Sequence, residues 1–384
     1  MKSKKHHIYA DNAATTKIDP VTFDAMVPFL KDIYANPSSL HSLGKCARDA
    51  VESARQQIAS CIGASPDSIV FTSGGTESDN LAINGVVRAM RDKGSHVIAS
   101  AIEHHAVLNC CDALRKDGFA TTFLPVDASG LVSLDALSDA IRPQTKFVSI
   151  MMANNEIGTI QDIYRLASIT HDRGLIFHTD AVQAVGHIPV NVAELGVDLL
   201  SASAHKFNGP KGVGFLYIRK GVTLYSFMNG GQQEAGYRAG TENVAGIVGM
   251  ACALKNHFVT LSDNINKLNR MSAMLASRIS SIIPEARFNG HATERLPGLL
   301  SISFPRISAE SLMHLLDLKG IFISTGAACN SKATVVSHVL HAIKLTEEYS
   351  AGTIRISLSK DNTESETVII ADSIVSFYSK LSRR

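Results

Sequence analysis

Residues 197–218, VDLLSASAHKFNGPKGVGFLYI, contain two short apolar runs on either side of a polar, glycine-rich turn that carries Lys206. Short apolar runs without strict alternation are typical of strands buried on both faces of a sheet. Five more such runs precede this stretch, namely SIVFTS (68–73), HVIAS (96–100), TTFLPV (121–126), KFVSIMMA (146–153) and GLIFHTD (174–180). Helical stretches such as residues 77–94 lie between them. The pattern predicts an α/β domain with a mainly parallel, seven-stranded sheet.

The pattern changes near residue 258. A long amphipathic stretch at 261–283 is followed by short runs that we interpret as mixed strands and helices, GLLSISFP (298–305), SAESLMHLLDLKG (308–320) and TIRISLS (353–359). We therefore expect a large domain over residues 16–257, and a smaller α+β domain formed by residues 1–15 and 258–384. Thr363 and Glu366 have capping-box spacing and predict the start of the last helix.

Composition excludes several function classes. The 384 residues include 37 basic and 35 acidic side chains, a formal charge of +2, so we expect no direct nucleic-acid or membrane partner. Because no run of 18 apolar residues or signal-like segment is present, we expect a cytoplasmic protein.

The six cysteines lack metal-type CxxC spacing, so we expect reduced thiols and no metal site. We interpret Cys46, Cys61 and Cys252 as small buried hydrophobes, and Cys110 and Cys111 as structural.

Polar residues follow several predicted strands, where open α/β sheets bind their ligands. The segment TSGGTESDN (72–80) follows the first strand. Gly74 and Gly75 would allow close backbone approach, and Thr76, with Asp79 three residues later, is expected to cap a helix whose N-terminus can receive a phosphate. The alternative is an ordinary capped glycine turn.

A flat ring cofactor would explain the other polar strand ends. Asp180 ends a strand that is otherwise apolar, and a carboxylate there needs a partner such as a pyridinium nitrogen or a structural hydrogen bond. His104 can supply an aromatic face and Asn155 an edge donor, unless both are only loop polarity. Lys206 can form a Schiff base with a carbonyl-bearing cofactor. Phosphate site, acid and lysine together indicate pyridoxal 5'-phosphate (PLP).

These residues also carry a family resemblance. The chain resembles the cysteine desulfurases, fold-type I enzymes of the class V aminotransferase group, in motifs that run in order from about residue 8 to 360. The motifs are YADNAATT (9–16), NPSSLHSLG (36–44), FTSGGTESDNLAI (71–83), EHHAVL (103–108), NNEIGTIQ (154–161), HTDAVQAVG (178–186), SASAHKFNGPKGVGFLY (201–217), GGQQEAGYRAGTEN (230–243) and STGAACNS (324–331).

The resemblance implies roles for the site residues. Lys206 would bind PLP covalently, Asp180 would pair with the pyridine nitrogen, and His104 would stack on the ring and move protons. Other cofactor contacts are implied for Gly75, Thr76, Asn155, Gln183, Ser203, His205 and Thr241 of the partner subunit. The resemblance thus implies a homodimer.

Cys329 distinguishes a desulfurase from other enzymes with this fold. It lies in a small-residue stretch after an apolar run, and a mobile loop suits a thiol that must attack and then leave the site. The resemblance implies that L-cysteine becomes L-alanine, that Arg355 binds the substrate carboxylate with Asn155, and that Cys329 accepts sulfur as a persulfide. Cys329 would then pass it to an acceptor protein, or ligate a transient cluster with a partner.

Two alternative functions stay open, a selenocysteine lyase and a weakly catalytic sulfur-relay scaffold. A nicotinamide dehydrogenase is disfavoured because no GxGxxG follows the first strand. The stretch NGGQQE, the absence of Leu-Glu-Pro after Cys329 and the ending KLSRR depart from the family pattern. The first departure is minor, but the other two concern surfaces where sulfur acceptors dock, so the acceptor is open between an iron–sulfur scaffold and an enzyme that thiolates tRNA, DNA or a cofactor.

Overall fold

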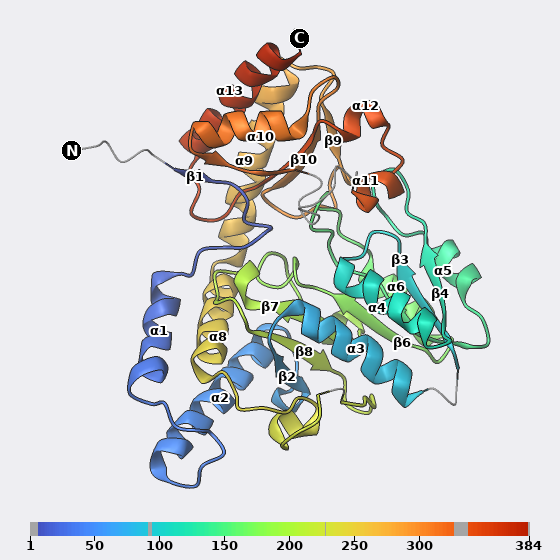
Figure 1. Cartoon of the computed structure of the whole chain (residues 1–384), viewed down its shortest axis with the longest axis vertical. Helices are drawn as coiled ribbons and strands as arrows, with labels where there is room; N and C mark the ends of the chain where they lie inside the picture. Colours follow the sequence, from blue (N-terminus) through green and yellow to red (C-terminus); the bar gives the residue numbers. More distant parts are fainter. Residues whose placement is uncertain (1–6, 91–93, 227, 326–336, 383–384) are drawn as a thin grey trace.

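The computed structural model describes residues 7–90, 94–226, 228–325 and 337–382. Its centre is a seven-stranded sheet with the order β2-β8-β7-β6-β5-β3-β4 (Figure 1). The strands in this order are Ile69–Thr72, Gly214–Ile218, Leu199–Ser203, Ile176–Asp180, Thr145–Ser149, His96–Ser100 and Ala120–Leu124. All seven predicted strands are present, which confirms the predicted α/β fold.

One strand runs against the others. β8 is antiparallel to both β2 and β7, whereas the remaining pairs are parallel. The cause is the short connection at residues 204–213, because a parallel neighbour would need a crossover of a dozen residues or more. Two antiparallel steps make β2 parallel to β7, so their carboxyl ends share one edge of the sheet with that of β6.

Helices cover both faces of this sheet. Successive strand residues point to opposite faces, so Phe147 packs in one core cluster and Val148 in the other. One cluster includes side chains of α2, α6 and α8, and the other those of α3 and α4. These helices are Ser42–Cys61, Ile163–His171, Val244–Val259, Gly75–Ala89 and His105–Lys116; α1 (Pro20–Lys31), α5 (Leu134–Ala140) and α7 (Val192–Leu195) complete this part.

A second core lies around a smaller sheet with the order β12-β13-β10-β9, formed by Ser324–Thr325, Thr353–Ser357, Leu299–Ser303 and Arg287–Asn289. The helices α9 (Leu261–Ser280), α10 (Ala309–Leu318) and α13 (Glu364–Leu381) contribute to this core, and α11 (His338–Ala342) and α12 (Glu347–Ser350) connect the strands. β1 (Ile8–Tyr9) pairs in parallel with β11 (Ile321–Phe322), so the start of the chain lies beside its C-terminal part. The capping box predicted for α13 is confirmed.

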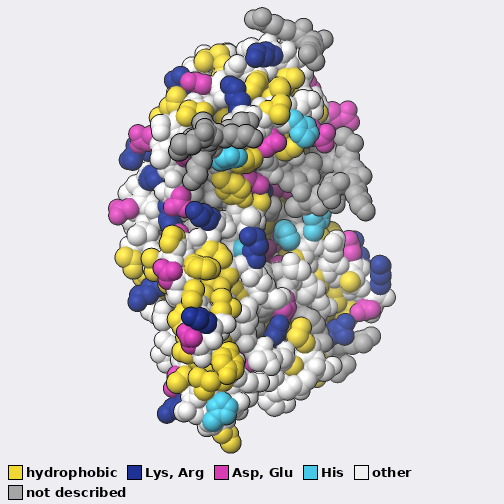
Figure 2. Space-filling model, turned by 60° about the vertical axis from the view of Figure 1, so that its left-hand side comes forward, with side chains coloured by type: hydrophobic (Ala, Val, Ile, Leu, Met, Phe, Trp, Pro, Cys, Tyr) yellow, Lys and Arg dark blue, Asp and Glu magenta, His cyan; other side chains and the backbone are white. Residues whose placement is uncertain are grey.

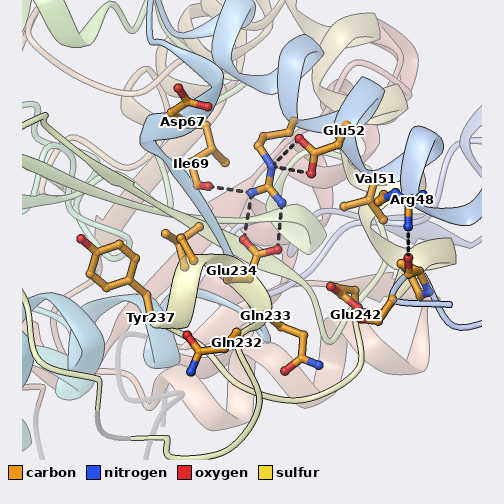
Figure 3. Close-up of a pocket in the computed structure, with 15 residues that line it drawn as sticks. Arg48, Val51, Glu52, Asp67, Ile69, Gln232, Gln233, Glu234, Tyr237 and Glu242 are labelled. Carbon is orange, nitrogen blue, oxygen red and sulfur yellow. Dashed lines mark hydrogen bonds and ion pairs between the residues drawn. The ribbon is translucent and has the colours of Figure 1, made fainter. Parts of the chain in front are cut away.

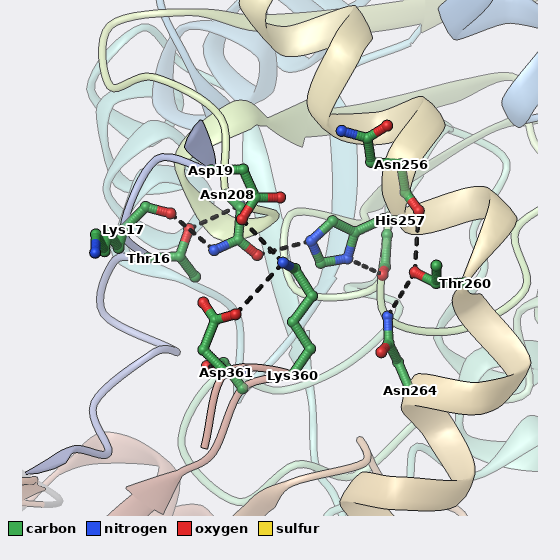
Figure 4. A network of polar contacts seen from close by, with 12 residues as sticks. Thr16, Lys17, Asp19, Asn208, Asn256, His257, Thr260, Asn264, Lys360 and Asp361 are labelled. Atoms are coloured by element: carbon green, nitrogen blue, oxygen red, sulfur yellow. Dashed lines mark hydrogen bonds and ion pairs between the residues drawn. The ribbon is translucent and has the colours of Figure 1, made fainter. Parts of the chain in front are cut away.

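A polar network joins the segments that run between the two cores (Figure 4). His257 of α8 contacts Asn208 Oδ1 through Nε2 at 2.7 Å, and Asn208 donates from Nδ2 to the Lys17 carbonyl at 2.7 Å. Lys360, which follows β13, pairs with Asp19 at 2.9 Å. These contacts fix the N-terminal segment against both parts of the molecule.

The cysteine prediction is partly wrong. Cys110 and Cys111 are buried, but Cys46 is exposed and Cys61 and Cys252 are only half-buried. Cys46 lies on a helix that has both a core-facing and a solvent-facing side, and a run of alanines does not reveal which side a residue occupies. Within the described ranges no single helix is long and apolar enough to cross a membrane; α8 and α9 pass that test only as a pair bent by 71°.

Candidate active site

The residues of the predicted anion site lie together at the carboxyl edge of the large sheet. A cavity of about 440 Å³ is lined by Ala14, Thr15, Ser73, Gly74, Gly75, Thr76, Glu77, Ser203, His205, Lys211 and Gly212. Four of the predicted cofactor residues, Gly75, Thr76, Ser203 and His205, are therefore together. The N-terminus of α3 faces this group, and its first-turn N–H groups have no helical carbonyl to bind.

Glycines make this cradle possible. Gly74 has a φ of 148°, and a Cβ there would lie 3.4 Å from Ser203 Oγ. A Cβ on Gly75 would lie 2.5 Å from Val182 Cγ2, and one on Gly214 would lie 2.7 Å from Gly74 Cα. Side chains at these positions would fill or distort the space that a phosphate needs, so the cradle and its donors fit PLP's phosphate.

The predicted Thr76 cap is wrong. The N-cap of α3 is Gly74, no side chain caps the helix, and Thr76 lies in its first turn beside the cavity. Asp79 is fully enclosed and contacts the buried His178 rather than the helix terminus. The glycine pair starts the helix two residues earlier, which leaves the Thr76 side chain available to a ligand.

Lys206 lies where the turn after β7 meets the N-terminal segment. Its Nζ donates to the carbonyl oxygens of Ala13 and Ala14 at 2.7 and 2.8 Å. His187 contacts the Lys206 carbonyl through Nε2 at 2.9 Å, which holds the backbone of the turn. The amine is thus held at the same edge of the sheet as the cradle.

Asp180 and His104 interact electrostatically with this amine. Burial raises the pKa of Asp180, and His104 when protonated and the Lys206 charge oppose the rise. Burial likewise lowers the pKa of His104. The His104 Nδ1 accepts from the Ala106 N–H at 3.1 Å, so the neutral ring carries its proton on Nε2. The site therefore contains an enclosed anion, a neutral imidazole and an amine close together, a donor set that suits a pyridinium ring and its carbonyl group.

Three more predicted residues line the region between the two sheets. Gln183 donates from Nε2 to the Ala13 carbonyl at 2.9 Å, the same oxygen that Lys206 contacts. Arg355 of β13 donates from Nη1 to the Asn155 carbonyl at 3.0 Å. Arg355 thus reaches from the small sheet to the loop that follows β5.

One predicted residue lines a neighbouring cavity, and another is not among the described residues. Thr241 lines a neighbouring cavity of about 100 Å³ that shares Ser73 and Gly212 with the cradle, so its predicted role across a subunit boundary stays a prediction. Cys329 lies outside the described residues.

A further cavity, of about 540 Å³, contains none of the predicted site residues (Figure 3). Its wall holds Arg55, whose guanidinium donates to both carboxylate oxygens of Glu234 at 2.8 and 2.9 Å and also contacts Glu52. These charges already pair with one another, so this cavity lacks the convergent donors of the cradle.

Sequence reasoning did not predict that two acids, Glu103 and Asp79, are buried near Asp180. Burial raises the pKa of Glu103 to about 8, and its Oε1 accepts from Ser100 Oγ at 2.5 Å and from the Met151 N–H at 2.8 Å. Burial, followed by the Asp180 charge, raises the pKa of Asp79. Because the Lys206 ammonium opposes the rise in the pKa of Asp180, we assign the negative charge of this cluster to Asp180. Polar residues inside the strand-end motifs were the only available signal.

The N-terminal segment is the other missed part. Ala13 and Ala14 bind Lys206, Thr15 Oγ1 lies 3.1 Å from His205 Nδ1, and Asp11 pairs with Arg355 at 2.8 Å. The motif YADNAATT carried the resemblance, but no chemical role was assigned to its residues.

Glu156, next to Asn155, predicts a pH effect on stability. Burial raises its pKa from 4.5 to about 7. The Ser337 hydroxyl, which donates to Oε2 at 2.5 Å, and the Arg355 charge both oppose this rise. Between these values the unfolded chain has lost a proton that the folded chain keeps, so the free energy of unfolding falls as pH rises, by up to about 1.4 kcal/mol per pH unit. We expect Glu156→Gln to remove this contribution. Urea unfolding of both proteins from pH 4 to 8 checks it, and parallel curves would contradict it.

Comparisons with known proteins agree along nearly the whole chain. The model of the aminotransferase class-V family matches residues 8–368. Cysteine desulfurase IscS of Dictyoglomus turgidum is 48% identical over 377 residues, which are 98% of this chain and 96% of that relative. A solved NifS-like protein has a TM-score of 0.92 at 39% identity and covers 98% of this chain and 100% of its own. The solved structure of SspA in complex with cysteine has a TM-score of 0.81 at 35% identity, covering 93% and 100%. The family match includes every predicted site residue.

Proposed function

The chain belongs to the aminotransferase class-V family, and from this premise we propose that it is a PLP-dependent cysteine desulfurase. It converts L-cysteine to L-alanine and transfers the sulfur to a thiol. The observation that carries this function is the convergence of Lys206, Asp180 and His104 beside the anion cradle. The anion cradle, the enclosed acid and the amine match the phosphate, the pyridine nitrogen and the carbonyl of one cofactor.

We propose these residues as the cofactor site. The cradle would hold the phosphate, Asp180 the ring nitrogen and Lys206 Nζ the carbonyl carbon, with His104 on the ring. Asn155 and Gln183 would bind the ring oxygen. When bound, PLP withdraws electrons from the α-carbon of an amino acid.

The chain's own residues would orient the substrate and move its protons. Arg355 binds the α-carboxylate with paired N–H donors, and the Asn155 side chain assists. Lys206 Nζ takes the α-proton, and His104, with its proton on Nε2, donates and accepts protons near the ring. Asp180 is buried, so little water would screen the attraction between its carboxylate and a protonated ring nitrogen.

Cys329 is the proposed sulfur acceptor within the chain. Its thiolate attacks the substrate sulfur, so an S–S bond forms while the Cβ–S bond breaks. The electron pair of the broken bond passes to carbon, which takes up a proton and becomes the methyl group of alanine. The products are L-alanine and a persulfide on Cys329, and no external oxidant or reductant is needed.

We also propose a homodimer in which Thr241 of the partner subunit completes the phosphate site. Exposed apolar side chains gather along the lower half of one face (Figure 2), and Val21, Phe23 and Leu30 of α1 are 53–63% exposed. Exposed apolar surface of this kind favours association.

We propose a cytoplasmic location, because the five thiols among the described residues form no disulfides, as is usual in that compartment. A sulfur-acceptor protein, either an iron–sulfur scaffold or a thiolation enzyme, would collect the persulfide.

The proposed function is tested with the purified protein and added PLP. We expect equal amounts of alanine and sulfur from L-cysteine in the presence of a reducing thiol. L-Selenocysteine, assayed under the same conditions, separates a desulfurase from a selenocysteine lyase, for which only the selenium substrate would react well. No alanine from either substrate would refute both activities and favour a relay role.

A further inference from the structure

Arg355 is held by two groups of the chain. Its side chain is 7% exposed. Nη2 donates to Asp11 Oδ1 at 2.8 Å, and Nη1 donates to the Asn155 carbonyl at 3.0 Å. Nε is buried and has no hydrogen-bond partner within the described part of the chain. The guanidinium is therefore anchored at both terminal nitrogens but is not saturated by the protein.

The backbone of Asp11 is itself fixed relative to Arg355. Asp11 forms a bridge with Ser357, two residues beyond Arg355 on β13. Asn12, the next residue, donates from its N–H and from Nδ2 to the Ser357 carbonyl at 3.1 and 2.8 Å. Tyr9 adds a hydrogen bond from its hydroxyl to the Asp11 carbonyl at 3.1 Å. These backbone and side-chain contacts hold the Asp11 carboxylate in a defined position relative to β13.

Charge explains why an acid is needed there. A guanidinium enclosed to this degree is costly without a counter-ion, and a free arginine side chain must also lose rotamer entropy to present its donors. Asp11 supplies the counter-ion and orders the Arg355 side chain before any substrate binds. Its own side chain is 20% exposed, so solvent reduces the repulsion that a second carboxylate would feel.

We propose that Asp11 is a positioning residue for substrate recognition: its carboxylate fixes the plane of the Arg355 guanidinium so that the remaining N–H donors meet the α-carboxylate of the amino acid. This inference rests on the proposed function, because it assigns Arg355 to the substrate carboxylate. Asp11 acts through Arg355 and takes no part in proton transfer. Its loss should therefore weaken binding of the carboxylate and leave the later steps nearly unchanged.

Two variants of Asp11 test this. We expect Asp11→Ala to raise KM for L-cysteine about 10-fold to 100-fold, the range of a lost charged hydrogen bond, and to change kcat by less than about 3-fold. Asp11→Asn keeps an acceptor oxygen without the charge, and we expect an intermediate KM. The proposal would be overturned if kcat fell in both variants by as large a factor as KM rose, or if KM stayed unchanged.

Asp19→Ala is the matched control. Asp19 is another acid of the N-terminal segment, and its ion pair with Lys360 also joins that segment to the chain that follows β13. Asp19→Ala should leave KM within about 2-fold of wild type, although it removes a comparable ion pair. A KM increase equal to that of Asp11→Ala would show that general anchoring of the segment, not the Arg355 contact, is responsible.

A double-mutant cycle with a binding readout separates this inference from the proposed function. Binding of L-alanine is measured from the shift in thermal unfolding temperature of the PLP-loaded protein. In the wild-type background, Asp11→Ala should weaken L-alanine binding about 10-fold or more. In an Arg355→Ala background, the same substitution should not weaken binding further. Additive effects would overturn the positioning role. If L-cysteine is not converted but the cycle is non-additive, the proposed function fails and the role of Asp11 stands.

Discussion

Lys206→Ala is expected to lower alanine formation from L-cysteine by a factor of about 10³ or more, because one side chain both holds the proposed cofactor and moves the α-proton. Removal of Nζ also takes two hydrogen bonds from the Ala13 and Ala14 carbonyls, which loosens the N-terminal wall of the site. Absorption spectra after PLP addition and gel filtration, together with alanine release, measure both losses.

The control for this variant is Lys220→Ala. Lys220 is exposed after β8 and lies at the opposite end of that strand from the glycine turn. It should keep wild-type activity and the bound-cofactor spectrum. Alanine release by Lys206→Ala within about tenfold of wild type would mean that another group performs these steps and that the lysine assignment is wrong.

Cys329→Ala is expected to abolish persulfide formation and to lower sulfur release from L-cysteine by a factor of about 10³, because no other thiol would replace the nucleophile. The protein should still bind PLP and L-cysteine, since the residues proposed for those tasks lie elsewhere. Persulfide is measured by alkylation and mass spectrometry after incubation with substrate, and sulfide by release with a reducing thiol.

Two other cysteines serve as controls. Cys46 is an exposed thiol, and Cys46→Ala tests whether solvent access alone is enough for persulfide formation. Cys110 is enclosed, and burial raises the pKa of its thiol to about 12, so little thiolate exists at neutral pH. Cys46→Ala and Cys110→Ala should both keep wild-type activity. Persulfide on Cys46 or Cys110 in the Cys329→Ala protein would contradict the assignment of the nucleophile.

The seven strands could be predicted because each is a local apolar run bounded by turn residues, and the runs fall within a few residues of the observed strands. The capping box at Thr363 was likewise a local pattern. The start of α3 was predicted wrongly, because the sequence TSGGTESDN offers a threonine cap and a glycine start that differ by two residues. Gly214 lies close to Gly74, the residue at which the helix starts, although the two are 140 residues apart in the chain.

The sequence by itself determined the strand pattern, the strand-end positions of Lys206 and Asp180, and the family, since each depends on residues close together in the chain or on motifs in a fixed order. Only the tertiary structure decided that the N-terminal segment forms a wall of the site and that Asp11 pairs with Arg355, 344 residues away. It also decided that Asp79 and Glu103 lie enclosed near Asp180. The physical reason is that ion pairing and desolvation depend on distance and burial in space, which the order of residues along the chain does not contain.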